Sequence, residues 1–103
     1  MIQLLKDNQD AIADLCKRTD VVSLSVFGSA ARVEDYVLGK SDIDLLVTFG
    51  PDFVKHAFDK YFLLINELEE LFGARVGIVT ESQLTNPYLI ESINHDRALL
   101  YAA

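Results

Sequence analysis

The chain has 103 residues, half of them hydrophobic, and 16 acidic side chains against 9 basic ones give it a formal net charge of -7. A length close to that of one ordinary domain, with this hydrophobic content, predicts a single core formed by residues 1–103. The basic residues are scattered, so the chain would repel a phosphate backbone, and we exclude long nucleic acid as a partner. A small nucleotide carried with cations remains compatible with this charge.

The sequence contains one cysteine, Cys16, which leaves no internal disulfide and no thiolate metal site and predicts a reducing compartment. No window approaches the roughly 18 to 20 apolar residues of a membrane span, and the first ten residues lack a cleavable signal pattern. We therefore expect a soluble cytoplasmic protein without a membrane partner.

The first third of the chain predicts a helix, a strand and a short helix. Residues 4–18 carry apolar side chains at helical spacing, which predicts an amphipathic helix. Residues 21–27 alternate as the side chains of a strand do. Gly28 ends this strand, and the helix-forming residues after it predict a brief helix that begins near Ser29.

The middle of the chain predicts a second strand and a long helix. Residues 42–49 alternate in the manner of a strand, and the pair Gly50-Pro51 closes it. A helix is expected over residues 53–72, with Gly73 as its left-handed cap. The side chains expected to face the core from this helix are those of Phe58, Tyr61, Phe62, Ile65, Leu68 and Phe72.

The last third predicts a strand over residues 75–80 and a helix from Pro87 to about His95 that Asn86 caps. The segment at 98–102 is compatible with either a strand or a helical turn. The side chains expected to turn inward from the helix are Leu89, Ile90 and Ile93. This order of elements predicts an α/β (or α+β) fold in which helices cover a small sheet of three to four strands.

Asp42 and Asp44 stand two residues apart at the start of the second predicted strand. Alternate residues of a strand point to the same side, so both carboxylates share one face while Ile43 enters the core. Two like charges this close repel each other unless a cation lies between them, and carboxylate oxygens suit Mg²⁺ or Mn²⁺. Two surface aspartates would give the same pattern, but apolar Leu46 on the same face favours a dedicated pair.

Gly28 and Ser29 follow the first predicted strand directly. Glycine lets the backbone approach a ligand closely, a helix that begins there presents N–H groups, and the serine hydroxyl can donate to a phosphate oxygen. An ordinary turn with Ser29 as a helix cap is the competing explanation. A P-loop is excluded, because no Lys-Ser or Lys-Thr follows the glycine. Combined with the two aspartates, the pair predicts an anion site beside a cation site.

These motifs carry a resemblance to a known family. The string FGSAAR at residues 27–32, followed by DIDLLV at 42–47, resembles the Gly-Ser and Asp-x-Asp signature of the DNA polymerase β-type nucleotidyltransferase superfamily. With its length and its ending VTESQLTNPYLIESINHDRALLY, the chain is similar over essentially its whole length to the minimal nucleotidyltransferases, or MNT proteins. The resemblance implies a nucleotidyltransferase fold with a short mixed sheet, in a single domain at 1–103.

The resemblance also implies roles for the motif residues. Gly28 and Ser29 would hold the triphosphate of a nucleotide, and Asp42 and Asp44 would bind divalent metal (Mg²⁺ or Mn²⁺) and serve as the catalytic residues. Arg32 matches the basic residue of the family motif and would either orient phosphates or bind an acidic neighbour. The implied reaction moves a nucleoside monophosphate, AMP from ATP, onto an acceptor hydroxyl. The implied partner is a HEPN-type toxin, with this chain as its antitoxin.

One position departs from the family pattern. Gly77 stands where the family has its third carboxylate, and losing such a group is expected to lower the rate by roughly 10² to 10⁴. Three interpretations follow: a working transferase, a degenerate antitoxin that binds nucleotide or partner without efficient catalysis, or an unrelated α/β interaction module. The small size further predicts that another chain completes the site, in an oligomer or a complex.

Overall fold

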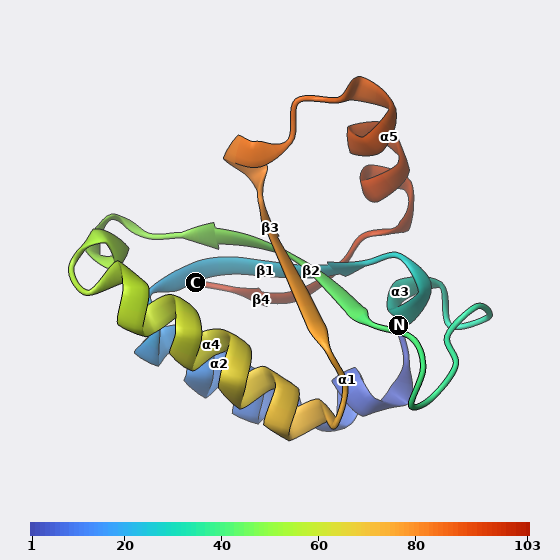
Figure 1. Ribbon diagram of the computed structural model, residues 1–103, viewed down its shortest axis with the longest axis horizontal. Coiled ribbons are helices and arrows are strands. Elements are labelled where there is room, and N and C mark those ends of the chain that lie inside the picture. Colours follow the sequence, from blue (N-terminus) through green and yellow to red (C-terminus); the bar gives the residue numbers. More distant parts are fainter.

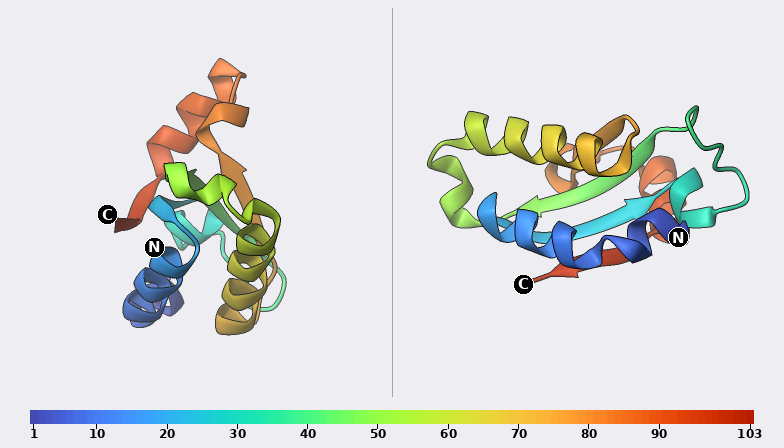
Figure 2. Two further views of the ribbon diagram at one scale, coloured as in Figure 1. Left: turned by 90° about the vertical axis from the view of Figure 1, so that its left-hand side faces the viewer. Right: turned by 90° about the horizontal axis from the view of Figure 1, so that it is seen from below.

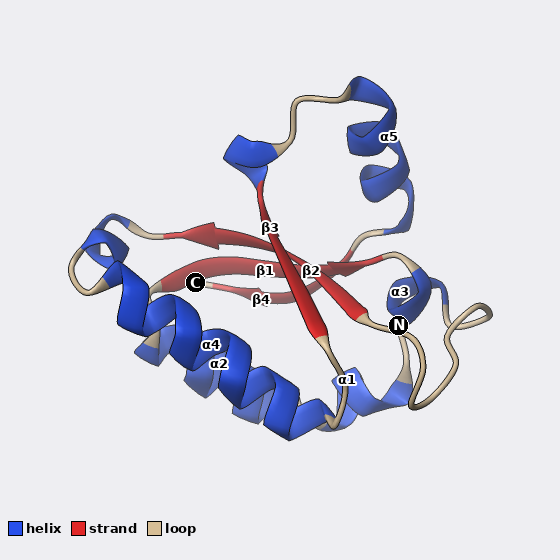
Figure 3. Ribbon diagram, viewed as in Figure 1, coloured by secondary structure: helices blue, strands red, loops and turns tan.

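The computed structural model describes residues 1–103, in which helices lie against both faces of a four-stranded sheet (Figures 1 and 3). No helix combines the length and the apolar character that a membrane span requires. In chain order the elements are α1 (Gln3–Asp7), α2 (Gln9–Arg18), β1 (Val21–Phe27), α3 (Ser29–Arg32), β2 (Ile43–Phe49), the 3₁₀ helix η1 (Pro51–Val54), α4 (Ala57–Phe72), β3 (Val76–Thr80), the 3₁₀ helix η2 (Glu81–Gln83), α5 (Pro87–Asp96) and β4 (Ala98–Ala102).

The sheet has the strand order β3-β2-β1-β4 and is mixed. Strand β1 pairs antiparallel with β2 and with β4, whereas β2 and β3 run parallel and are joined through α4. The segment at 98–102, for which the sequence allowed a strand or a helical turn, is therefore an edge strand. The predicted α/β class and the small mixed sheet are confirmed.

The two faces of the sheet have different roles. Helices α2 and α4 lie side by side under one face, and α5 lies over part of the other (Figure 2). Alternation along β2 sends Ile43, Leu45 and Val47 into the core between sheet and helices, where all three are fully buried. Asp44 and Leu46 consequently belong to the opposite face, where the candidate site lies.

The helix expected over residues 4–18 is interrupted at Asn8, so that prediction was wrong in this detail. The Asn8 side chain donates from Nδ2 to the Leu4 carbonyl at 2.8 Å. Short amide side chains compete in this way with the backbone hydrogen bonds of a helix. The Asn8 carbonyl accepts from the Ile12 N–H, so α2 begins directly after the interruption.

Helix α4 ends at Gly73 in the left-handed conformation, as predicted, but only part of its predicted stripe faces the core. Phe58 is 75% exposed and Phe62 is 45% exposed. They form one row of side chains four residues apart, and their rings contact each other with centroids separated by 4.6 Å. The sheet covers a neighbouring row instead, and the buried members of α4 are Leu64, Leu68 and Phe72.

This difference predicts unequal stability effects along α4. Leu64→Ala is expected to lower the free energy of unfolding by about 2 to 5 kcal/mol, because it removes a fully buried side chain and leaves a cavity. Phe58→Ala is expected to change it by no more than about 0.5 kcal/mol. Urea denaturation of both variants checks the pair, and equal losses would show that the Phe58 row packs against the core in solution.

Candidate functional site

Gly28 and Asp44 come together where β1 ends and β2 begins. The antiparallel register pairs Phe27 with Asp44, so the next residue, Gly28, faces the aspartate. A Cβ atom at Gly28 would lie 3.0 Å from Asp44 Oδ2, and the backbone there has φ +70°, which side chains rarely allow. Glycine is therefore required here by its conformation as well as by the close approach.

Gly77 lies on the other side of the same aspartate. The parallel register of β2 and β3 pairs Asp44 with Gly77, and a Cβ atom at Gly77 would lie 3.2 Å from Asp44 Oδ1. The carboxylate of Asp44 thus stands between two glycines from neighbouring strands, and bare backbone flanks both of its oxygens. A carboxylate at position 77 would be its direct neighbour.

Asp42 directly precedes β2, one residue outside the strand, and its side chain is exposed. Asp44 is half-buried, and its pKa is raised, first by burial and second by the negative charge of Asp42. The two carboxylates are therefore close enough for the charge of Asp42 to disfavour the ionised form of Asp44, in line with the repulsion that their spacing predicts. No cluster of three or more His, Cys, Asp or Glu residues that could hold a metal ion forms in the structure.

Ser29 begins α3, a single turn of helix whose last residue is Arg32. The Arg32 side chain donates from Nε to Asp35 at 3.0 Å and from Nη1 to Asp96 at 2.6 Å. Of the two roles considered for Arg32, the structure shows the contact with acidic neighbours. The hydrogen bonds to Asp96 and Asp35 raise the pKa of the guanidinium, and those from His95 and Arg32 lower the pKa of the Asp96 carboxyl.

The Asp96 contact was not foreseen from the sequence. Its side chain is only 12% exposed and belongs to the last residue of α5, 64 residues from Arg32. It ties the turn that follows Gly28 and Ser29 to the helix over the same face of the sheet. Nothing in the local sequence around either residue signals this pairing.

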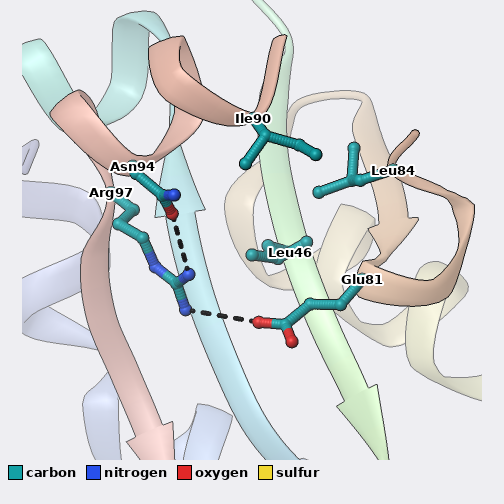
Figure 4. Close-up of a pocket in the computed structure, with 6 residues that line it drawn as sticks. All are labelled: Leu46, Glu81, Leu84, Ile90, Asn94 and Arg97. Carbon is teal, nitrogen blue, oxygen red and sulfur yellow. Dashed lines mark hydrogen bonds and ion pairs between the residues drawn. The ribbon is translucent and has the colours of Figure 1, made fainter. Parts of the chain in front are cut away.

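A pocket of about 290 Å³ opens on this face, between β2, η2 and α5 (Figure 4). Arg97 lies at its polar side and donates from Nη1 to Asn94 Oδ1 at 3.2 Å, while its Nη2 lies 3.7 Å from Glu81 Oε1. No motif in the sequence predicts this pocket. Its lining comprises three aliphatic side chains, Leu46, Leu84 and Ile90, and three polar ones, Glu81, Asn94 and Arg97.

A family profile, a related sequence and a solved structure all match this chain and indicate the same family. Residues 9–100 match the sequence profile of the family described as "Nucleotidyltransferase domain". A protein of Methanocaldococcus jannaschii, provisionally named a protein adenylyltransferase, is 34% identical over 94 residues, which are 91% of this chain and 88% of that protein. A solved structure, described provisionally as a minimal nucleotidyltransferase, shares 34% identity at a TM-score of 0.72 and covers 93% of this chain and 92% of its own.

A more distant solved structure shares the fold. It is described as a tri-AMPylated Shewanella oneidensis HEPN toxin in complex with its MNT antitoxin, and the matched chain has a TM-score of 0.62 at 17% identity over 96% of this chain and 73% of its own. The profile match and the relative of 34% identity confirm the resemblance to the nucleotidyltransferases. The chain therefore belongs to the nucleotidyltransferase domain family.

Proposed function

We propose that residues 1–103 form one minimal nucleotidyltransferase domain that binds a nucleoside triphosphate with a divalent cation and transfers AMP from ATP to a hydroxyl group of another protein. The observation that supports this most directly is the setting of Asp44. Its half-buried carboxylate lies beside Asp42 and between Gly28 and Gly77, on an open face of the sheet.

The two aspartates fit a divalent cation. Their oxygens are the hard ligands that Mg²⁺ and Mn²⁺ prefer. Burial, and after it the charge of Asp42, raises the pKa of Asp44, and a bound cation would offset both effects. Glycines at positions 28 and 77 leave the space beside both oxygens of Asp44 unfilled. When bound, the cation would neutralise phosphate charge and polarise the phosphorus that is attacked.

The turn after β1 would hold the phosphates. Gly28 lets the backbone come close to them, and the partly exposed Ser29 can donate its hydroxyl. Arg32 hydrogen-bonds Asp35 and Asp96 through Nε and Nη1, so its position is fixed while its Nη2 could still donate to a phosphate oxygen. We propose that Arg32 therefore combines both roles considered for it.

The acceptor side of the site lacks a base of its own. Gly77 offers no side chain next to Asp44, so no second carboxylate is available there to take the proton of an acceptor hydroxyl. By the usual contribution of a general base, transfer would be slower by roughly 10² to 10⁴ than with a carboxylate at this position.

This same observation favours a second candidate function. The chain could act as an antitoxin that binds nucleotide or its partner without efficient catalysis. For either candidate we propose a HEPN-type toxin as the partner and the cytoplasm as the compartment, because the fold is shared with an MNT antitoxin in complex with such a toxin. Family membership removes the third interpretation, an unrelated interaction module.

A labelling experiment tests the proposal. The protein is incubated with Mg²⁺, a candidate HEPN-type toxin and ATP labelled at either the α- or the γ-phosphate. Transfer of AMP leaves the α label, but not the γ label, on the toxin. Binding of Mg²⁺-ATP, or of the toxin alone, without transfer would favour the second candidate. The absence of transfer, of Mg²⁺-ATP binding and of toxin binding would contradict the two candidates together.

A further inference from the structure

The pocket over Leu46 is close to the carboxylates and on the same face of the sheet. Leu46 follows Asp44 by two residues, so the two side chains project to the same side about 7 Å apart along β2. Leu46 is 3% exposed and forms the floor of the pocket, which η2 and α5 wall on opposite sides (Figure 4). A molecule bound at Asp44 by one end can therefore reach the pocket with the other.

The lining divides into an apolar part and a polar part. Leu46, Leu84 and Ile90 present aliphatic surface, which suits the faces of a flat ring. Glu81 supplies a carboxylate that accepts hydrogen bonds, and Arg97 and Asn94 supply N–H groups that donate them. Small-molecule sites typically combine an apolar lining with a few convergent polar groups in this way, from volumes of about 300 Å³ upward.

We infer that this pocket receives the base of the bound nucleotide. The base lies against Leu46, Leu84 and Ile90, and its exocyclic amino group faces the Glu81 carboxylate while ring nitrogens face Arg97 and Asn94. The inference rests on the proposed function, because it requires the phosphates to lie beside Gly28 and Asp44. It adds a base subsite that neither the Gly-Ser motif nor the aspartates specify.

Charge supports this direction of binding. Glu81 forms an ion pair with Arg97 at 3.7 Å, so the charged groups of the pocket balance and leave no net positive charge to attract a triphosphate. The phosphate end of the nucleotide is better placed beside Gly28 and Arg32, away from Glu81. An uncharged base with an amino group suits the pocket, whereas a phosphate does not.

Filling the pocket tests the inference. Ile90→Trp would occupy the space between α5 and Leu46, and Leu84→Trp would do so from the opposite wall. Leu89→Trp is the matched control, because Leu89 lies on the same helix but is 48% exposed and does not line the pocket. Calorimetry measures the Kd of each protein for Mg²⁺-ATP and for Mg²⁺ with inorganic tripolyphosphate, which has the phosphates without the base.

The wild-type chain is expected to bind ATP about tenfold or more tightly than tripolyphosphate. Ile90→Trp and Leu84→Trp should abolish this difference and leave tripolyphosphate binding unchanged, while Leu89→Trp retains the difference. An ATP preference that survives in both filling variants, or that is absent from the wild type, would overturn the base subsite although the phosphate site stands. If the wild type binds neither ligand, the proposed function fails and this inference fails with it.

A measurement on the unchanged protein covers the case in which the tryptophan variants do not fold. Adenosine, which has no phosphate, is titrated into protein labelled at its methyl groups and followed by NMR. The largest shifts are expected at the methyl groups of Leu46, Leu84 and Ile90. Shifts concentrated elsewhere, or no shift at millimolar adenosine, would contradict the inference.

Discussion

Gly77→Asp is expected to increase the rate of AMP transfer by roughly 10² to 10⁴. The parallel register places position 77 directly beside Asp44, and the new Cβ atom would lie 3.2 Å from Asp44 Oδ1. This is a tight contact that requires the Asp44 side chain to move by a few tenths of an ångström. Gly77 has no positive φ, so the backbone itself accepts a side chain. Single-turnover measurements with labelled ATP and the acceptor protein give the rate.

The charge of the new residue distinguishes this effect from a change of shape. Three neighbouring carboxylates repel one another more than two do, so Gly77→Asp should lower the melting temperature without a cation and increase the stabilisation by Mg²⁺. Gly77→Asn has nearly the same size and no charge, and it should leave both the rate and the Mg²⁺ response close to those of the wild type. Equal rates for the two variants would argue against a missing general base.

The elements themselves were largely predictable from local signals. The alternation in β1 and β2, Gly73 as a left-handed cap and Asn86 as a cap that accepts from the Tyr88 N–H are all properties of a few adjacent residues. Which face of α4 is buried could not be predicted in this way, because the apolar residues of this helix form two neighbouring rows. Which row is buried depends on where the sheet lies, and that is set by strand pairing far along the chain.

The sequence was also insufficient to predict which residues of α5 are buried. Leu89 was expected to turn inward, but it is 48% exposed, whereas Ile93 is buried as predicted. The helix covers only part of the sheet, which leaves a narrower apolar contact than its sequence suggests. The pocket over Leu46 exists because α5 covers the sheet only in part. A sequence pattern does not show which part of a sheet a helix leaves uncovered.

The candidate site likewise combines residues that local sequence predicts with contacts that depend on the fold. Asp42 and Asp44 were predicted from their spacing, because a strand fixes which neighbours share a face, and Gly28 and Ser29 from their place directly after a strand. Their roles remain predictions. The contact of Arg32 with Asp96 joins residues 64 positions apart and depends on how α5 docks. The adjacency of Gly77 and Asp44 depends on the register of two parallel strands, which the family resemblance implied but no local pattern could give.

Asp44→Asn is expected to weaken binding of Mg²⁺-ATP by more than about 100-fold, since changing even residues behind metal ligands typically costs 10- to 100-fold in metal affinity. The same variant should be more stable than the wild type without ligand. Burial and the Asp42 charge raise the pKa of Asp44, so its ionised form is disfavoured in the folded state and subtracts stability at neutral pH. Asparagine keeps the shape and removes the charge.

The opposite signs of the two effects make this prediction specific. A residue that only supports the fold would lose stability and binding together, whereas a ligand residue held against like charge gains stability when binding is lost. Glu67→Gln is the control, because Glu67 is exposed on α4 and its change removes one negative charge far from the site. Melting curves with and without Mg²⁺-ATP measure both quantities. An Asp44→Asn protein that melts lower than the wild type, or that Mg²⁺-ATP still stabilises, would place the cation elsewhere.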